Sequence, residues 1–348
     1  MTVATRLAFA GAAIIAVFAA TSLQARDLTV VSWGGNMQDG QRQAYIAPFA
    51  KEKGIRVLEE SWDGGIGVIQ ARVRAGNPNW DVVQVEAEEL ALGCFDGLYE
   101  QIDWSRIGDQ ASFLPQAVSP CGVGTYVWST VLAYDGNVLS DGPKSWADFW
   151  NVEKFPGKRG LRRGPKYTLE FALQADGVPV NEVYDLLSTP AGVDRAFKKL
   201  DELKPHIVWW EAGAQPLQLL ATGEVAMTSA YNGRITGVNR SEGRNLRIVW
   251  DGSIPAVDSW VILKGSPNVE LAHEFISFAS RPERVAALPE FIAYGPPTVP
   301  GTELVPEKLR TDLPTYPANL EHALPLNVDF WVDNLEELNQ RFNAWVGQ

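Results

Sequence analysis

Aromatic and charged side chains recur in this 348-residue sequence close to the points where apolar, strand-like runs end. Ring faces attract cations, carboxylates pair with ammonium groups, and an arginine guanidinium can bind a carboxylate through two parallel hydrogen bonds. Such a set favours a site that holds a small charged solute, for which no covalent step is needed. The candidate binding residues are Trp33, Asn36, Glu86, Glu88, Tyr167, Gln215, Tyr231, Arg234, Asp258 and Tyr294.

Sequence motifs of the common enzyme classes are missing. The chain has no HExxH, no pair of CxxC motifs, no GxSxG and no GxxxxGK[ST], which mark zinc sites, serine hydrolases and phosphate loops. The GGIG at 64–67 lacks the spacing of a dinucleotide-binding loop and is more typical of a helix start. We therefore predict a binding protein that is not an enzyme, with no metal or cofactor. The alternative is an exported hydrolase that uses two carboxylates in the site that would otherwise only bind the solute.

The elements that must position these residues alternate between strand and helix. Apolar runs at 27–33, 55–61 and 80–85 predict buried strands, and the segments 38–53 and 65–76 between them have helical periodicity. This order is typical of a doubly wound α/β domain. A second α/β unit is predicted in the middle of the chain. Its strands are expected at 126–135, 157–162, 207–210, 225–233 (a strand running into a turn), 246–252 and 258–265.

The N-terminus has the pattern of a secretory signal peptide. Arg6 precedes an apolar stretch at 7–20, and Leu23-Gln24-Ala25 offers a cleavage site. The stretch is shorter than the ~20 apolar residues of a membrane span, although an uncleaved anchor is the alternative. Cleavage near Ala25 leaves about 323 residues (348 minus 25), and a chain of that length favours two domains.

The charge and the cysteines narrow the class of protein further. A formal net charge of −12 argues against nucleic acid as a partner, because the phosphate backbone attracts basic proteins. An even number of cysteines in an exported chain suggests one disulfide, here Cys94–Cys121. Two buried thiols are the alternative.

Several segments, taken in order, resemble the periplasmic spermidine/putrescine-binding family of ABC importer substrate-binding proteins. No single segment is decisive, but their order and spacing are, and they cover nearly all of the mature chain. They are Trp33 after the first strand, WDVV (80–83), SWADFW (145–150), KFPGKRG (154–160), ATGEVAM (221–227) leading to Tyr231–Gly233, Asp258, Tyr294–Pro296 and SPNVELAHEFISFASRPE (266–283).

The resemblance implies an α/β periplasmic-binding-protein fold with two lobes, a ligand cleft between them and several hinge crossings. Lobe one is expected at 26–133 plus 256–298, and lobe two at 134–255 plus 299–348. It also implies a monomer in the periplasm that delivers a small amine-bearing ligand to an inner-membrane ABC permease. In the cleft, aromatic faces would surround the cationic amine and carboxylates would pair with it.

The sequence departs from the polyamine pattern where lobe two should supply carboxylates. Those positions align here with Lys166, Tyr167 and Arg234, whereas Glu86 replaces a small polar residue of lobe one. Two like charges about 4 Å apart cost about 4 kcal/mol at an effective dielectric of 20, so a dication is disfavoured. We therefore predict a zwitterion such as an ω-amino acid. Its amine is expected against Trp33, Glu86 and Asp258, and its carboxylate against Arg234.

Structural roles for these residues stay open as alternatives. Trp33 can be core packing, and Lys166 can be an exposed residue. The other open structural roles are a turn carboxylate for Asp258, a solvated helix start for Glu88 and packing in a Pro-rich turn for Tyr294. Arg234 can point to solvent or pair with Glu86 or Glu88 across the cleft, and in either case a polyamine could still bind. Trp128 is expected to be structural, as are Trp146, Trp150, Trp250 and Trp331.

Overall fold

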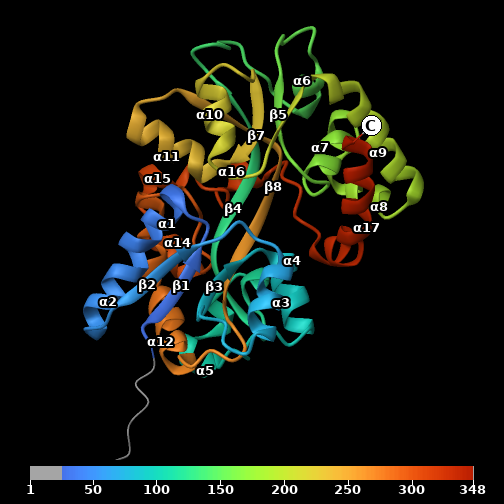
Figure 1. The fold of residues 1–348 in the computed structure, drawn as a ribbon. Helices are drawn as coiled ribbons and strands as arrows, with labels where there is room; N and C mark the ends of the chain where they lie inside the picture. The colour runs from blue at the N-terminus through green and yellow to red at the C-terminus, as the bar shows by residue number, and fades with distance from the viewer. Residues whose placement is uncertain (1–25, 348) are drawn as a thin grey trace, which may run out of the picture.

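A computed structural model describes residues 26–347 of the chain, so the predicted signal peptide lies outside the described residues. Two lobes, one above the other in Figure 1, share a single eight-stranded sheet with the order β2-β1-β3-β8-β4-β7-β5-β6. The predicted two-lobe α/β fold is thus confirmed. The strands are β1 Leu28–Ser32, β2 Val57–Ser61, β3 Val82–Val85, β4 Gly122–Asp135, β5 Arg159–Arg162, β6 Ile207–Trp210, β7 Met227–Tyr231 and β8 Leu246–Ile262.

Each lobe combines short parallel strands with one end of the long antiparallel pair β4 and β8. In lobe one β1 pairs in parallel with β2 and β3, and in lobe two β5 pairs in parallel with β6 and β7. The strands β4 and β8 pair with each other along their length and run through both lobes (Figure 1). They therefore form the crossing that the fold requires, and they carry residues past the cleft.

Helices cover the sheet in each lobe. In lobe one they are α1 Gly35–Gln41, α2 Ala47–Lys53, α3 Ile66–Arg74, α4 Ala87–Phe95, α5 Trp104–Ile107, α12 Val269–Ala279 and α13 Pro282–Val285, with the π-helical turn Arg42–Ile46 joining α1 to α2. In lobe two they are α6 Trp146–Trp150, α7 Thr168–Ala175, α8 Val183–Leu187, α9 Pro190–Leu203, α10 Gln215–Ala221 and α11 Asn232–Glu242. The C-terminal part contains α14 Val299–Leu304, α15 Glu307–Arg310, α16 Pro317–Leu320 and α17 Val328–Val346.

One strand differs from the prediction. The two strands expected at 246–252 and 258–265 are the single strand β8, which continues through Gly252 and Pro255. The residues between the two predicted strands pair with β4, for example Ile254 with Thr130. A register shift in β4 between Thr130 and Leu132 accommodates the irregularity. Pairing with β4 therefore outweighs the tendency of Gly252 and Pro255 to end a strand.

The C-terminal remainder divides between the lobes. The helix α17 lies beside α9 in lobe two, where Trp345 packs against Phe197. By contrast α14 packs against α13, and Val305 and Leu313 share a buried cluster with Ala293. Residues in 299–313 therefore pack against α13 and the segment that follows it.

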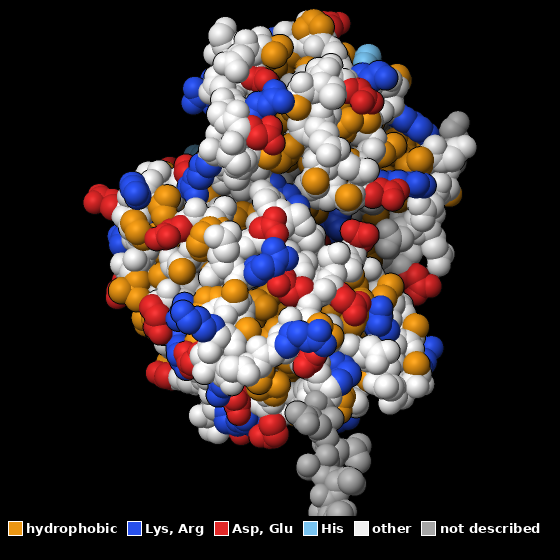
Figure 2. All heavy atoms as spheres, turned by 60° about the vertical axis from the view of Figure 1, so that its left-hand side comes forward, with side chains coloured by type: hydrophobic (Ala, Val, Ile, Leu, Met, Phe, Trp, Pro, Cys, Tyr) orange, Lys and Arg blue, Asp and Glu red, His pale blue; other side chains and the backbone are white. Residues whose placement is uncertain are grey.

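The predicted disulfide is present between Cys94 at the end of α4 and Cys121 before β4, with the Cα atoms 5.6 Å apart. It joins a helix of lobe one to the start of the crossing strand. Among residues 26–347, none of the helices has the length and apolar character of a membrane span. On the face shown in Figure 2, acidic and basic side chains are interspersed over both lobes.

Candidate functional site

A cavity lies between the lobes, where the carboxyl ends of several strands meet. This edge is where open α/β sheets bind their ligands. Its volume is about 70 Å³, on a scale where one water molecule needs about 10–15 Å³, so the cavity suits a short solute. The lining residues are Trp33, Met37, Trp62, Asp63, Glu86, Tyr126, Trp128, Arg162, Glu211, Ala212, Gly213, Tyr231, Arg234, Asp258 and Tyr294.

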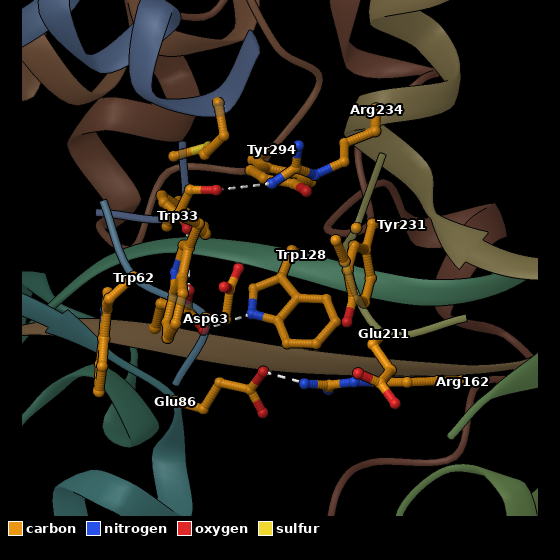
Figure 3. A pocket seen from close by; sticks show the side chains of 15 residues that line it. Trp33, Trp62, Asp63, Glu86, Trp128, Arg162, Glu211, Tyr231, Arg234 and Tyr294 are labelled. Carbon is orange, nitrogen blue, oxygen red and sulfur yellow. Dashed lines mark hydrogen bonds and ion pairs between the residues drawn. The ribbon is translucent and has the colours of Figure 1, made fainter. Parts of the chain in front are cut away.

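Aromatic rings form most of the apolar wall, and they support one another in pairs (Figure 3). Trp33, which follows β1, stacks on Trp62 with ring centroids 5.3 Å apart and planes 11° apart. Trp128 of β4 meets Tyr231 of β7 edge to face at 4.9 Å. Because rings packed on rings have little rotational freedom, these faces form a rigid surface that attracts a cation.

Asp258 of β8 holds two of these rings in place. Its Oδ2 accepts hydrogen bonds from Trp33 Nε1 at 2.6 Å and from Tyr126 OH at 2.9 Å, and its Oδ1 accepts one from Trp128 Nε1 at 2.6 Å. Gln84 Nε2 also donates to it, at 3.0 Å. Burial raises the pKa of Asp258 to about 7, with a further contribution from the negative charge of Glu86, although the hydrogen bonds oppose the rise. Asp258 therefore orients both indoles and adds negative charge beneath them.

Arg234 lies at one end of the cavity, in the first turn of α11. Its side chain is buried, with 8% of the residue exposed, and its Nη2 donates to the backbone oxygen of Trp33 at 3.3 Å (Figure 3). Its Nε is buried without a hydrogen-bond partner. No carboxylate of residues 26–347 forms an ion pair with it. An uncompensated buried charge is unfavourable, so this end of the cavity favours an anion, and the helix N-terminus adds to that preference.

The guanidinium of Arg234 fits between two glycines. A β-carbon at Gly213 would lie 3.0 Å from Nε, and one at Gly35 would lie 3.1 Å from Nη1. A larger residue at either position would crowd the guanidinium. These glycines come from opposite lobes, so the space around Arg234 exists only when both lobes are close together.

At the other end of the cavity, buried acidic and basic side chains pair with one another in an ion network. Glu86, the N-cap residue of α4, lies 3.3 Å from Arg162 Nη1, and Lys166 Nζ donates to both Glu86 and Glu88. Burial favours the neutral form of Glu86, but the neighbouring Lys166 and Arg162 cations lower its pKa to about 2. Burial raises the pKa of Glu88, and Lys166 opposes that rise. The glutamates belong to lobe one and the cations to lobe two, so this network spans the cleft.

Six of the predicted binding residues lie together in the cavity wall: Trp33, Glu86, Tyr231, Arg234, Asp258 and Tyr294. The structure places the others elsewhere. Glu88 lies behind Glu86 in the ion network. Tyr167 packs edge to face behind Trp128 at 5.9 Å. Gln215 accepts from the backbone N–H groups of residues 211 and 212 at the start of α10, and Asn36 lines a separate cavity beside α11.

Two alternative interpretations are wrong in this structure. Lys166 is buried, with 8% exposed, and is not a surface residue. Arg234 does not pair with Glu86 or Glu88, because Arg162 and Lys166 do.

Sequence reasoning missed several wall residues. Trp128, expected to be structural, lines the cavity because β4 crosses the cleft at that point. Trp62 and Asp63 follow β2, and Arg162 ends β5, so the strand-end rule that gave Trp33 could have found them. The sequence has no signal for where a crossing strand passes the cleft.

Comparison with known proteins agrees with this geometry. The family model described as bacterial extracellular solute-binding protein matches residues 44–312. A γ-aminobutyric acid-binding protein of Pseudomonas aeruginosa is 51% identical over 334 residues, covering 96% of this chain and 95% of that protein. A putrescine-binding periplasmic protein of the same species is 23% identical over 305 residues, covering 79% and 81%. The crystal structure of an ABC transporter substrate-binding protein from Bradyrhizobium japonicum has a TM-score of 0.84 and 39% identity, and covers 92% and 99%.

Proposed function

The chain belongs to the family of bacterial extracellular solute-binding proteins, and on that premise we propose that this ABC-importer substrate-binding protein carries a zwitterionic ω-amino acid such as γ-aminobutyrate. Its relatives are binding proteins and not enzymes, which removes the hydrolase alternative. Its activity is capture and release of a solute, with delivery to a membrane permease as the outcome.

The observation that carries the proposal is the buried Arg234 without a carboxylate partner within residues 26–347. A ligand carboxylate supplies the missing anion and can accept two hydrogen bonds from the guanidinium. A charge-assisted hydrogen bond of this kind contributes about 1.5–3 kcal/mol.

The ammonium of the ligand finds its partners at the opposite end. The faces of Trp33 and Trp128 are turned to the cavity, and Glu86 lies below them (Figure 3). Cation–π contacts contribute about 0.5–2 kcal/mol each. Since Asp258 is already hydrogen-bonded to both indoles, we infer that it acts on the ammonium through its charge.

A dication fits less well, because its second ammonium would meet Arg234. The 51% identical relative is named for γ-aminobutyrate, and the putrescine-binding relative is only 23% identical. These identities support the zwitterion over the polyamine. We further propose that the mature protein is a periplasmic monomer released by cleavage near Ala25, and that nucleic acid is not a partner.

Isothermal titration calorimetry with four ligands of equal chain length tests the proposal. They are γ-aminobutyrate, n-butylamine, butyrate and 1,4-diaminobutane (putrescine). We expect γ-aminobutyrate to bind at least about a hundredfold more tightly than either single-charge analogue, because each analogue loses one charged contact. Putrescine binding as tightly as γ-aminobutyrate would contradict the proposal.

A further inference from the structure

Lys166 and the two glutamates that it contacts form a buried site beside the ligand cavity. Lys166 Nζ donates to Oε2 of Glu86 and to Oε1 of Glu88. The exposed fractions of these side chains are 9% for Lys166, 15% for Glu86 and 7% for Glu88. An ammonium group between two carboxylates is also the arrangement with which a protein binds the amine of a ligand.

This acidic site adjoins the ligand cavity. A second hollow, lined by residues that include Glu86, Glu88, Arg162 and Lys166, shares Asp63, Glu86 and Arg162 with the wall of the ligand cavity. Glu86 therefore stands between the two spaces. A second ammonium on an extended ligand could reach the acidic site only if the Lys166 ammonium were absent.

The carboxyl groups have unused capacity for a cation. Glu88 Oε2 is buried and has no hydrogen-bond partner, and Glu88 as a whole is 5% exposed. Without Lys166, Arg162 would be the remaining cation in contact with the pair, and it contacts only Glu86. The vacated pair would then attract an external cation, because buried carboxyl groups without a counter-charge are unfavourable.

The backbone holds Lys166 in this position. The next residue, Tyr167, has φ +70° and is one of two described residues other than glycine with positive φ. Such a conformation is costly for a bulky residue and persists where the surroundings enforce it, often at functional positions. The Lys166 Nζ also lies 5.0 Å from the centroid of the Tyr167 ring.

We propose that Lys166 is a specificity-determining residue whose ammonium occupies an acidic subsite and thereby excludes ligands with a second ammonium group. The inference rests on the proposed function, since it assumes that an amine binds in the adjoining cavity. It goes further in assigning to Lys166, which does not line that cavity, the rejection of dications.

The test compares 1,4-diaminobutane with n-butylamine, which has one ammonium on the same four-carbon chain. The ratio of their affinities, measured by calorimetry at pH 7.5, isolates the effect of the second charge. In Lys166→Met this ratio should shift toward the diamine by about tenfold or more, because a like charge is removed and two carboxyl groups are vacated. Lys166→Arg, which keeps the charge, should leave the ratio within about twofold of wild type.

A double variant separates the effect of the Glu88 charge from the effect of the space that Lys166 leaves. Lys166→Met combined with Glu88→Gln leaves the same room but removes one carboxylate, so most of the shift toward the diamine should disappear. If Lys166→Met does not fold, Lys166→Gln replaces it, since its amide can still donate to a glutamate. Thermal shift on addition of each amine then gives the same comparison.

The proposal is overturned if a folded neutral variant shows no shift in the ratio, or if Lys166→Arg or the double variant shifts equally. The proposed function fails separately, through weak binding of γ-aminobutyrate to the wild-type protein. The amine ratio needs no zwitterion, so the two failures are distinguishable.

Discussion

At one end of the cavity Arg234 is buried without a carboxylate partner among residues 26–347, whereas at the other end Glu86 is matched by Arg162 and Lys166. At both ends, a buried cationic side chain of lobe two faces residues of lobe one. They differ in whether the protein itself supplies the counter-charge.

The difference indicates what each end does. Where the counter-charge is missing a ligand can provide it, so we propose that the Arg234 end favours closure of the lobes around an anion. Where the protein supplies the counter-charge, closure brings together an ion network without a ligand. The Glu86 end therefore contributes ion pairs between the lobes, and we propose that it also shapes the space for the ammonium of the ligand.

The largest expected effect comes from removing the uncompensated charge. We expect Arg234→Ala to weaken γ-aminobutyrate binding by about a hundredfold or more, because truncating one partner of a buried charge pair costs about 2–5 kcal/mol. Calorimetry measures the loss. Arg234→Lys is the matched control: it keeps the charge but not the two parallel hydrogen bonds, and should lose about tenfold. Equal affinity in all three proteins would show that the unpaired guanidinium of Arg234 does not bind the ligand.

A smaller loss is expected from the aromatic wall. Trp33→Leu removes a cation–π face and one hydrogen bond to Asp258, and should weaken binding by about tenfold to thirtyfold. The control is Trp250→Leu, at a partly buried tryptophan of β8 that packs against a hydrophobic cluster of lobe two and does not line the cavity. Binding can be followed by calorimetry, since both changes alter the intrinsic fluorescence.

The pH dependence of binding should report on Asp258. Its pKa of about 7 in the empty cavity falls when an ammonium binds nearby, so binding releases a proton below pH 7. Affinity for γ-aminobutyrate should therefore rise by about tenfold between pH 5.5 and 7.5 and then level off. Glu86, with a pKa of about 2, does not titrate in this range.

Asp258→Asn is the variant that checks this assignment. It keeps a similar shape but does not titrate, so its affinity should be lower and nearly independent of pH over the same range. An unchanged slope would assign the proton to another buried carboxyl, such as Glu89 or Glu170, whose pKa values are about 8 and 7.

The smallest effect is expected at Asn36. The sequence suggested this residue as a ligand contact, but it lies outside the cavity wall, beside α11. We expect Asn36→Ala to change the affinity for γ-aminobutyrate by less than about twofold, which is about 0.4 kcal/mol. A tenfold loss, measured by the same calorimetry, would extend the binding surface beyond the wall residues.

Much of the fold and part of the site followed from local sequence. Strand ends place Trp33 and Glu86 together in lobe one, because the parallel strands β1 and β3 expose their carboxyl ends at the same edge, and Tyr231 ends β7 in lobe two, on the opposite side of the cleft. The same rule applies to Arg234, in the first turn of the helix after β7. The alternation of strand and helix in the sequence was sufficient to predict two α/β units.

The remaining features depend on pairings between distant residues. Lys166 contacts Glu86 and Glu88 across 80 and 78 residues of sequence, and no local pattern specifies such a contact. Asp258 was expected to pair with the amine, yet it accepts hydrogen bonds from Trp33 and Trp128. Whether a charged residue is compensated is a property of the folded cleft, so the contrast between its two ends could not be read from the sequence.

We propose that one zwitterion spans the cavity, with its carboxylate against Arg234 and its ammonium between the aromatic faces and Glu86. The decisive experiment is a crystal structure of the protein with γ-aminobutyrate. We expect carboxylate oxygens about 2.7–3.2 Å from the guanidinium nitrogens, and the ammonium against Trp33 and Trp128. A ligand in the reverse orientation, or one bound outside this cavity, would contradict it.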